Sequence, residues 1–264
     1  IGGRVMSGGR ALPETLVQVP CPGSSFERPA YLMYTSGSTG APKGVLVSRR
    51  GVINVLCAFN ALVRGGRSCL KCSDQEAAEA SSGDAAETLV AVTTYCFDIS
   101  VLEIFWPLCF GFALFLASAN TARSGHRLSA LLAERGGRCS LLQGTPATWR
   151  SLVHAGWGGH EGFAAICGGE AFPPALAVPL RACAGRGVWN AYGPTEATIW
   201  ATTHHLGGAD DVPSSGAVPI GSPLANIELF IVAAEEGDDD AMSREIAAEG
   251  SSGVVPVVMG ELLI

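Results

Sequence analysis

Short apolar runs alternate with amphipathic segments along the chain from Tyr31 onward. The runs are bounded by turn-forming residues and are too short for helices, so they predict strands. The stretches between several of them carry apolar residues at helical spacing. Such an alternation is typical of an α/β domain with a largely parallel sheet. The predicted strands are Ala30–Tyr34, Val45–Val47, Thr88–Thr94, Phe112–Ala117, Cys139–Leu142, Phe163–Cys167 and Gly187–Asn190.

The helical segments have recognisable ends. A capping residue or a proline precedes each start, and a glycine follows one helix, Arg127–Arg135. Ser100 and Glu103 have the spacing of a capping box, in which the two side chains bond each other's backbone. The predicted starts are Ser48, Ser100, Thr145-Pro146 and Pro173-Pro174, and the predicted end is Gly136.

Composition excludes several classes of protein. The 264 residues are 48% hydrophobic and 16% charged, so the chain can bury a core and is not disordered as a whole. Most of the net charge of −7 lies in Glu235–Glu249, which carries −6. The remainder is nearly neutral, which argues against nucleic acid as a partner. We interpret residues 233–253 as an acidic loop insertion and Ser73–Ala86 as a loop or weak helix.

The nine cysteines do not form a recognisable framework. Their number is odd and their spacing irregular, whereas disulfide frameworks belong to short secreted chains. Cys69 and Cys72 form one C-x-x-C pair, which could indicate redox chemistry or half of a zinc site. No second pair stands at ligand spacing, so coincidence is the favoured interpretation. A reducing, cytoplasmic location is expected.

Membrane insertion is not expected. The most apolar stretch, Ile104–Ala117, has fourteen residues and contains Pro107, which is too short for a span. We interpret it as a buried helix followed by a buried strand. No secretory signal is visible at the N-terminus. The chain ends at Ile264 within an apolar run, so we expect it to be part of a longer protein.

The segment Tyr34–Gly44 carries the clearest chemistry. Its glycines, hydroxyl side chains and free backbone amides suit phosphate oxygens, and Lys43 adds a cation. It is not a P-loop, because Gly37 and Gly40 are three positions apart and glycine follows the lysine. An ordinary Ser/Gly turn is the alternative. The position between two predicted strands argues against a flexible linker.

This segment resembles the phosphate-binding signature of adenylate-forming enzymes, and more closely that of the adenylation domains of nonribosomal peptide synthetases. Further segments follow in the order of that family. The resemblance implies an α/β fold: part of the large N-terminal subdomain of an adenylate-forming enzyme, layered, with mostly parallel sheets. Residues 1–264 would be a partial adenylation domain without its N-terminal part and its C-terminal subdomain. The segments are Phe97–Ser100, Gly168–Ala171, Asn190–Glu196, Ile220–Pro223 and Gly260–Ile264.

The resemblance implies ATP and Mg²⁺ as cofactors. Tyr192 would stack on adenine, Thr195 would contact the α-phosphate, and Glu196 would bind the metal. Thr195, Glu196 and Lys43 are the implied catalytic residues, because they would spread charge at the α-phosphorus. Without the resemblance, the alternative interpretation is that Tyr192 is an aromatic residue of the core and Glu196 a charged residue of the surface. The implied ATP-binding residues are Thr35, Ser36, Gly37, Ser38, Thr39, Gly40, Lys43, Gly169, Glu170, Ala171, Asn190, Ala191, Tyr192, Gly193 and Thr195.

Asp98 is a candidate ligand for an amino group. Its apolar neighbours predict a half-buried carboxylate, which needs a partner, and a substrate α-ammonium would serve. A helix cap is the alternative, since Ser100 and Glu103 follow closely. The resemblance favours amino-group binding, and with it an amino acid rather than a fatty or aryl acid.

The resemblance also implies which residues line the side-chain pocket. Trp200 and its aliphatic neighbours leave little room and no spare charge, so glycine is the expected substrate. Alanine comes next, because Ala191 is smaller than the leucine common at that position. One methyl group is discriminated by only ~1–3 kcal/mol. The implied substrate-binding residues are Asp98, Ile99, Leu102, Gln143, Ile166, Gly168, Ala191, Ile199 and Trp200.

Topology predicts that these residues form one site. In open parallel sheets, ligands bind beyond the carboxyl ends of the strands. Each candidate segment follows a predicted strand, so we expect five loops to converge on one rim. They are the Thr35 loop, Asp98, Gln143-Gly144, Gly168-Gly169 and Asn190–Tyr192.

The predicted function is ATP-dependent activation of a small amino acid as its aminoacyl-adenylate for nonribosomal peptide synthesis. Phosphopantetheine on a peptidyl carrier domain would then receive the acyl group. An acyl- or aryl-CoA ligase of the same superfamily is one alternative, which Asp98 argues against. An inactive, truncated nucleotide-binding module is the other. We expect this chain alone to be weakly active or inactive, because neither Lys43 nor Lys71 matches the family's C-terminal lysine, and Arg49 replaces a common histidine.

Overall fold

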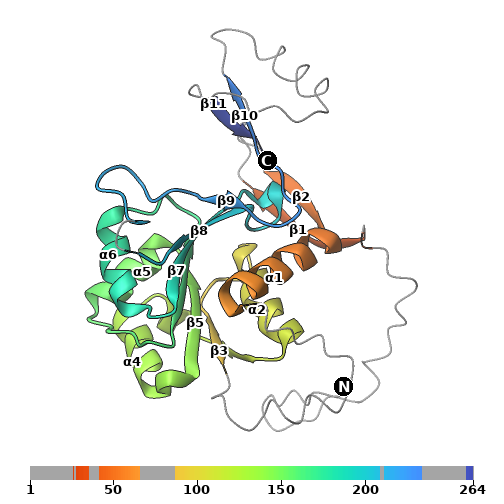
Figure 1. The fold of residues 1–264 in the computed structure, drawn as a ribbon. Helices are drawn as coiled ribbons and strands as arrows, with labels where there is room; N and C mark the ends of the chain where they lie inside the picture. Colours follow the sequence, from red (N-terminus) through yellow and green to blue (C-terminus); the bar gives the residue numbers. More distant parts are fainter. Residues whose placement is uncertain are drawn as a thin grey trace, which may run out of the picture.

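The computed structural model describes residues 26, 28–35, 42–65, 87–208, 211–233 and 260–263. Its centre is a seven-stranded sheet in the order β4-β3-β5-β6-β7-β8-β9 (Figure 1). The first five strands in this order run parallel, β8 pairs antiparallel with β7, and β9 pairs antiparallel with β8. The predicted α/β fold with a mostly parallel sheet is therefore confirmed. The strands are β3 (Thr88–Ala91), β4 (Ala113–Leu116), β5 (Cys139–Gly144), β6 (Ala164–Gly168), β7 (Gly187–Tyr192), β8 (Thr202–Leu206) and β9 (Ser222–Pro223).

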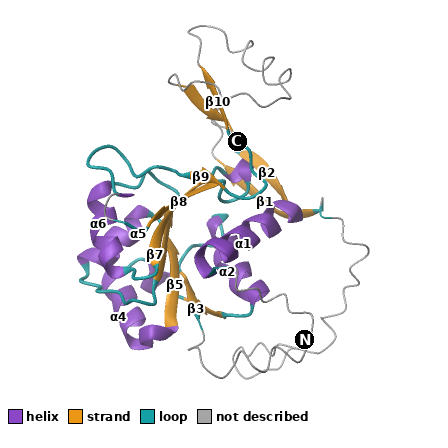
Figure 2. Ribbon diagram, viewed as in Figure 1, coloured by secondary structure: helices purple, strands orange, loops and turns teal. Residues whose placement is uncertain are grey.

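Two antiparallel hairpins lie outside this sheet. Strand β1 (Pro29–Thr35) pairs with β2 (Lys43–Ser48), and β10 (Phe230–Ala233) pairs with β11 (Gly260–Leu263). Figure 2 shows both pairs apart from the central strands. The expectation that five loops follow strands of one sheet is therefore wrong for Thr35. The connection after Thr35 joins two antiparallel strands of a separate hairpin.

Helices cover both faces of the sheet, which makes three layers. On one face lie α1 (Arg49–Arg64) and α2 (Ile99–Phe110), and on the other α4 (Gly125–Arg135), α5 (Pro146–His154) and α6 (Pro174–Cys183) (Figure 2). Successive strand residues contact opposite helical layers, as the period of two dictates. Leu141 packs with the α1–α2 layer, and Leu142 packs with the α4–α6 layer. Both layers of the core are thus continuous across the parallel strands.

The helix ends follow the sequence signals in most cases. Ser48 and Thr145 accept hydrogen bonds from the backbone amides of Gly51 and Thr148. Pro173 precedes α6, and Gly136 follows α4, although α4 begins at Gly125 rather than Arg127. The described residues also contain the short helices α3 (Ala119–Ala122), η2 (Gly136–Arg138) and η3 (Thr195–Ala197).

Several predicted boundaries shift. Strand β3 ends at Ala91 rather than Thr94, because the backbone amides of Val92 and Thr93 donate to the Glu103 carboxylate instead of to a neighbouring strand. Strands β5 and β7 are longer than predicted and include Gln143 and Tyr192 themselves. The predicted buried strand after α2 is β4, whose side chains are partly exposed because β4 is an edge of the sheet. The patterns did not predict β8 to β11.

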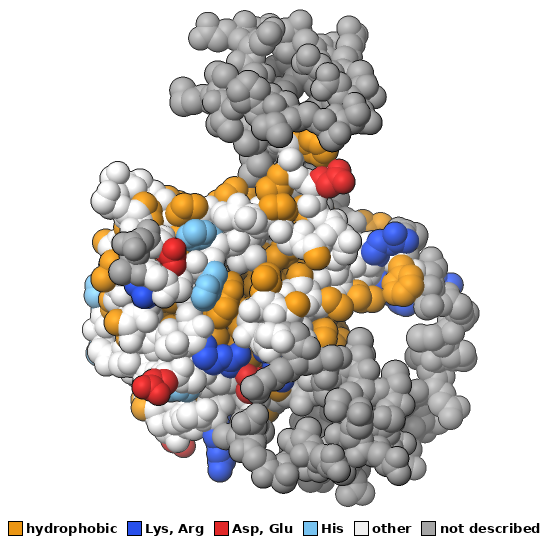
Figure 3. All heavy atoms as spheres, in the orientation of Figure 1, with side chains coloured by type: hydrophobic (Ala, Val, Ile, Leu, Met, Phe, Trp, Pro, Cys, Tyr) orange, Lys and Arg blue, Asp and Glu red, His pale blue; other side chains and the backbone are white. Residues whose placement is uncertain are grey.

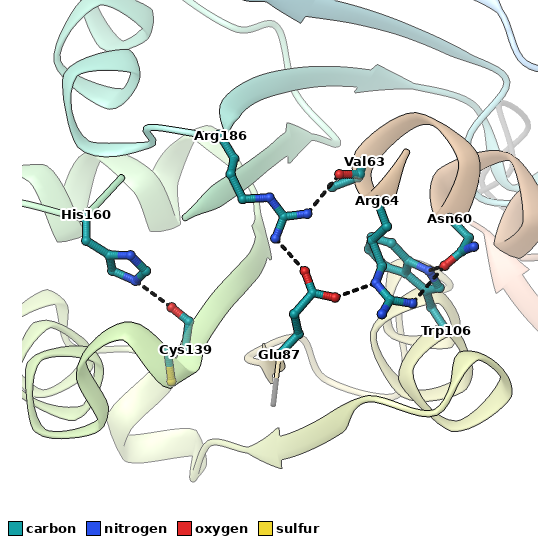
Figure 4. Close-up of polar contacts among 8 residues, drawn as sticks. All are labelled: Asn60, Val63, Arg64, Glu87, Trp106, Cys139, His160 and Arg186. Carbon is teal, nitrogen blue, oxygen red and sulfur yellow. Dashed lines mark hydrogen bonds and ion pairs between the residues drawn. The ribbon is translucent and has the colours of Figure 1, made fainter. Parts of the chain in front are cut away.

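Glu87, just before β3, joins two arginines from distant parts of the chain (Figure 4). Its carboxylate forms an ion pair with Arg64 of α1 and a second one, at 2.7 Å, with Arg186, the residue before β7. Arg186 also donates to the Val63 carbonyl at 2.9 Å. Beside this group, the Asn60 side-chain oxygen accepts hydrogen bonds from the Arg64 guanidinium and the Trp106 indole N–H. Figure 4 also shows His160, whose Nε2 atom lies 2.8 Å from the Cys139 carbonyl oxygen. The cluster ties α1 to the amino ends of two strands.

We expect Glu87→Gln to lower the free energy of unfolding by about 2 kcal/mol, because two partly buried guanidinium groups lose their carboxylate. Chemical denaturation of the natural protein, with any sequence that flanks this chain, would measure the change. Glu134→Gln, the same substitution on the exposed side of α4, is the control and should change stability by less than about 0.5 kcal/mol. Equal effects of the two substitutions would contradict this account.

Three predictions fall wholly or mostly outside the described residues: the loop Ser73–Ala86, the Cys69/Cys72 pair and the acidic insertion 233–253, of which only Ala233 is described. Within the described helices, none combines the length and the apolar character that a membrane span requires. On the face drawn in Figure 3, the described Lys and Arg side chains are scattered and form no single basic surface. The cytoplasmic location stays a prediction.

Candidate functional site

The carboxyl ends of four neighbouring parallel strands form one edge of the sheet. The order β3-β5-β6-β7 brings together the loop before Asp98, Gln143, Gly168 and the Asn190–Tyr192 end of β7. Four of the five expected segments therefore meet at this edge, although Gln143 and Gly168 lie in strands rather than in loops. In open α/β folds, ligands bind beyond these carboxyl ends of the parallel strands.

Asp98 is a buried carboxylate at the amino end of α2. It is 8% exposed, more buried than predicted, and its Oδ2 atom has no hydrogen-bond partner among the described atoms. Although Asp98 occupies the cap position, its side chain makes no capping hydrogen bond. Burial raises the pKa of Asp98, a hydrogen bond from the Thr195 side chain lowers it, and the charge of Glu196 raises it. The alternative interpretation of Asp98 as a side-chain helix cap is therefore wrong.

Tyr31 of β1 faces the same region and was not predicted as a site residue. Its hydroxyl is buried and also lacks a partner among the described atoms. Burial, and then the charge of Asp98, raise the pKa of the Tyr31 hydroxyl. The alternation along β1, with Tyr31 and Thr35 on the less exposed face, could have indicated that this side chain points inward. The Tyr31 hydroxyl and the Oδ2 atom of Asp98 thus lie near each other, and neither atom has a partner among the described atoms.

The predicted side-chain pocket is a single packed cluster. Six of its residues belong to the core layer on the α1–α2 side of the sheet. Gly168 is adjacent to Trp200, since a Cβ at Gly168 would lie 2.5 Å from the indole ring. Only glycine permits this close approach of ring and strand. The six residues are Ile99, Leu102, Ile166, Ala191, Ile199 and Trp200.

A strained turn carries Trp200 into this cluster. The Trp200 amide donates to the Thr198 carbonyl at 2.7 Å, which closes a γ turn at Ile199. Ile199 has a φ of 66°, a value that β-branched residues rarely adopt. Such conformations persist only where surrounding packing holds them, and they concentrate at functional sites. Here the packing is complete: Ile199 and Trp200 are each 1% exposed.

Glu103 does not form the predicted capping box. The Ser100 hydroxyl donates to the Phe97 carbonyl, and Glu103 points instead to the loop after β3. Its carboxylate accepts from the backbone amides of Val92 (3.1 Å) and Thr93 (3.0 Å) and from the Thr93 hydroxyl (2.7 Å). Burial raises the pKa of Glu103 to about 7, against the effect of the hydrogen bonds from Thr93. A completely buried carboxyl group with these partners was not predicted as part of the site.

A separate pocket of about 320 Å³ opens beside the carboxyl ends of β6 and β7. Tyr192, at the mouth, is 38% exposed, so it is not the core aromatic of the alternative interpretation. The Asn190 side chain is buried and donates to the carbonyls of Val218 and Pro219, which fixes the far wall. The lining residues are Gly169, Glu170, Ala171, Phe172, Asn190, Ala191, Tyr192, Gly193, Ala217, Val218 and Ile220.

Seven of these eleven lining residues are predicted ATP-binding residues, and the other four, Phe172, Ala217, Val218 and Ile220, were not predicted. Ile220 begins a segment that resembles a family motif, but no residue of this part of the chain was predicted to line a site. Its contribution to the pocket depends on hydrogen bonds between residues almost thirty positions apart, as in the pair Asn190 and Val218. Sequence spacing alone does not reveal such contacts.

Of the remaining predicted residues that the structure describes, Thr35 and Lys43 lie on the β1–β2 hairpin, and Thr195 and Glu196 lie on η3. Thr35 and Lys43 are paired across the end of the hairpin, and Ser36 to Gly40 lie outside the described residues. Strand β2 packs against η3, so Lys43 and Thr195 are on adjoining elements. Lys43 and Glu196 are both exposed. The hairpin, η3 and Asp98 therefore approach one another from three parts of the fold.

Glu196 fits one kind of metal site. The described residues contain no group of three His, Cys, Asp or Glu side chains that could enclose an ion. Mg²⁺, however, commonly uses one or two carboxylates together with water and substrate phosphates. An exposed carboxylate beside Asp98 and Thr195 is compatible with that arrangement.

The fold is that of an α/β domain with a pocket beside the carboxyl ends of its parallel strands and a buried carboxylate near them. The model of the AMP-binding enzyme family matches residues 6–255, and the chain belongs to this family. It is 33% identical, over 91% of its length, to a dimodular nonribosomal peptide synthase of Bacillus subtilis. It spans only 8% of that synthase. The predicted resemblance to the adenylation domains of nonribosomal peptide synthetases is thus confirmed.

Solved structures agree. A four-domain nonribosomal peptide synthetase bound to AMP and glycine superposes with a TM-score of 0.62 at 33% identity, covering 78% of this chain and 13% of that one. An adenylation domain of Vibrio cholerae in complex with glycyl-adenosine-5′-phosphate superposes with a TM-score of 0.64. It is 22% identical, covering 81% of this chain and 36% of that one, and shows the fold alone.

Proposed function

We propose that this chain binds ATP and a small amino acid, glycine first and alanine next, and joins them as an aminoacyl-adenylate. The observation that carries the proposal is the unpartnered Oδ2 of buried Asp98. A buried charge without a partner is unfavourable, and a substrate ammonium group supplies the partner. Fatty and aryl acids have no such group. Asp98 therefore favours an amino acid over the substrates of a CoA ligase.

The packing around Asp98 supports a small side chain. Trp200 lies against Gly168, and the aliphatic residues of the cluster are buried, so little space is left for substrate atoms. Among the cluster residues, Gln143 is polar but its amide is already hydrogen-bonded. A pocket of this kind accepts glycine and discriminates against larger side chains by steric exclusion. The solved synthetase that carries glycine is consistent with this assignment.

The neighbouring pocket suits the nucleotide. Its lining is mostly uncharged glycine, alanine and larger apolar residues, and Tyr192 is available for stacking on adenine. Thr195 contacts Asp98, so a nucleotide α-phosphate held by Thr195 would lie close to the carboxylate of an amino acid held by Asp98. Proximity of the two reacting groups is a main source of rate acceleration. Bound Mg²⁺ would supply charge stabilisation beside Glu196.

The product would pass to phosphopantetheine on a carrier domain. This part of the proposal rests on the similarity to nonribosomal peptide synthases and on an adenylation–carrier fusion among the similar structures, which covers 80% of this chain at 23% identity and a TM-score of 0.61. A thiol acceptor converts the reactive mixed anhydride into a thioester and releases AMP. The small amino acid and the carrier domain are the proposed partners.

Amino-acid-dependent ATP–pyrophosphate exchange tests the proposal. The natural protein, with any sequence that flanks this chain, would be assayed with all proteinogenic amino acids and with several fatty and aryl acids. We expect the highest kcat/KM with glycine and a lower value with alanine. Exchange driven by acids without an amino group would indicate a CoA ligase instead. Nucleotide binding without exchange for any acid would indicate an inactive module.

A further inference from the structure

We propose that Glu103 is a positioning residue that, through Gln143, holds Trp200 against Gly168 and so sets the size limit of the substrate pocket. The inference rests on the proposed function and adds to it a residue outside the pocket lining. Glu103 is 0% exposed and contacts none of the predicted nucleotide residues by a hydrogen bond that the structure describes. Its effect on the substrate is therefore indirect.

The link from Glu103 to the pocket is a continuous chain of hydrogen bonds. The Gln143 side-chain NH₂ donates to the Ile99 carbonyl at 2.8 Å and faces a Glu103 carboxylate oxygen at 3.4 Å. The Gln143 side-chain oxygen accepts from the Trp200 indole N–H at 2.9 Å. Every member is buried, and such networks hold a unique arrangement when all their groups are satisfied. Three elements, α2, β5 and the turn after η3, are joined by this chain.

The chemistry of the partners permits only one orientation of the Gln143 amide. An indole N–H can only donate, and a carbonyl or an ionised carboxylate can only accept. The amide oxygen must therefore face Trp200, and its NH₂ group must face Ile99 and Glu103. A second donor in place of the Glu103 carboxylate would oppose the Gln143 NH₂ group. Glu103 thus reinforces the amide orientation that Trp200 requires.

The same carboxylate also fixes the loop that leads to Asp98. Its bonds to the backbone amides of Val92 and Thr93 end β3 early and bind the loop to α2, whose amino end is Asp98. Both walls of the substrate site, Asp98 on one side and Trp200 on the other, are therefore connected to one side chain. Loss of this connection would loosen Trp200 more than Asp98, because the indole N–H of Trp200 bonds Gln143 and the Asp98 side chain does not.

Glu103→Gln tests the proposal, because it keeps the size of the side chain and replaces an acceptor by an amide. ATP–pyrophosphate exchange of the natural protein would be measured for glycine, alanine and valine, with KM and kcat determined separately for each amino acid and for ATP. We expect the KM for glycine to rise at least 10-fold and the glycine-to-alanine ratio of kcat/KM to fall at least 5-fold. The KM for ATP should change less than 2-fold.

Controls separate positioning from general damage. Glu134→Gln, the matched change on the exposed side of α4, should leave all these values unchanged. Gln143→Leu removes the same link from the other end, and Glu103→Gln should add little to the loss of selectivity in that background. A parallel fall of kcat for every amino acid with an unchanged glycine-to-alanine ratio would overturn the inference. Absence of exchange in the unmodified protein would overturn the proposed function instead.

A spectroscopic measurement does not depend on activity. The Trp200 indole N–H resonance, identified by its loss in Trp200→Phe, would be followed in ¹⁵N-labelled protein. In Glu103→Gln we expect its exchange with solvent to become at least 10-fold faster, while the resonance of Trp149, which donates to the Ile166 carbonyl, stays unchanged. Unchanged exchange at Trp200 would show that Glu103 does not hold this ring.

Discussion

Asp98→Asn is expected to lower kcat/KM for glycine in ATP–pyrophosphate exchange by about 100-fold or more, equivalent to ~3 kcal/mol. Asparagine keeps the shape of the side chain and can still bond Thr195, but it removes the charge that an ammonium group would need. The buried position of Asp98 strengthens the effect, since water screens little there. The KM for ATP should stay within about 3-fold, because the predicted nucleotide pocket lies on other residues.

The pH dependence provides a second readout. Burial raises the pKa of Asp98 above its ordinary value of 3.8, so the protonated, uncharged form persists to a higher pH than in a free aspartate. Below the folded-state pKa the carboxylate is lost, and kcat/KM for glycine should fall with it. This acid limb should be absent from Asp98→Asn.

Asp211→Asn is the matched control. Asp211 lies after β8 and accepts a hydrogen bond from the Gly208 amide, away from the pocket. The same chemical change at this position should alter kcat/KM by less than 2-fold. Equal effects at Asp98 and Asp211, or full activity of Asp98→Asn, would contradict the assignment of Asp98 to the amino group.

Trp200→Leu is expected to shift the substrate preference towards larger side chains. The substitution removes the ring that covers Gly168, and the space released would admit an aliphatic side chain. We expect the ratio of kcat/KM for valine over glycine to rise about 10-fold or more, in line with the ~1–3 kcal/mol that a methylene contributes to discrimination. Stability should fall by about 2 kcal/mol, because a fully buried aromatic residue is truncated.

Trp157→Leu separates selectivity from stability. Trp157 is buried in the core layer on the opposite side of the sheet, against Phe163. Its truncation should lower stability by a similar amount and leave the valine-to-glycine ratio unchanged. Both variants would be examined by substrate competition in the exchange assay and by chemical denaturation. A pocket that still excludes valine in Trp200→Leu would show that another group limits its size.

The sequence alone determined the class of fold and the location of the site. Strand–helix alternation predicted the parallel sheet, because the period of apolar residues depends only on local geometry. The motifs around Asp98, Gly168 and Tyr192 indicated the sheet edge at which they now meet, since strand ends are local features and the carboxyl ends of parallel strands coincide. The helix starts at Ser48 and Thr145 were predicted for the same reason.

Tertiary structure decided what depends on contacts between distant segments. Strands β1 and β2 pair with each other outside the central sheet, because strand pairing depends on the whole fold rather than on the apolar pattern of each strand. Glu103 matched a local capping motif, but the amides of Val92 and Thr93 together with Gln143 satisfy its carboxylate. A side chain bonds the partners that folding brings to it, and burial makes those bonds obligatory. The motifs therefore specify where this site lies, and long-range hydrogen bonds and packing determine its shape.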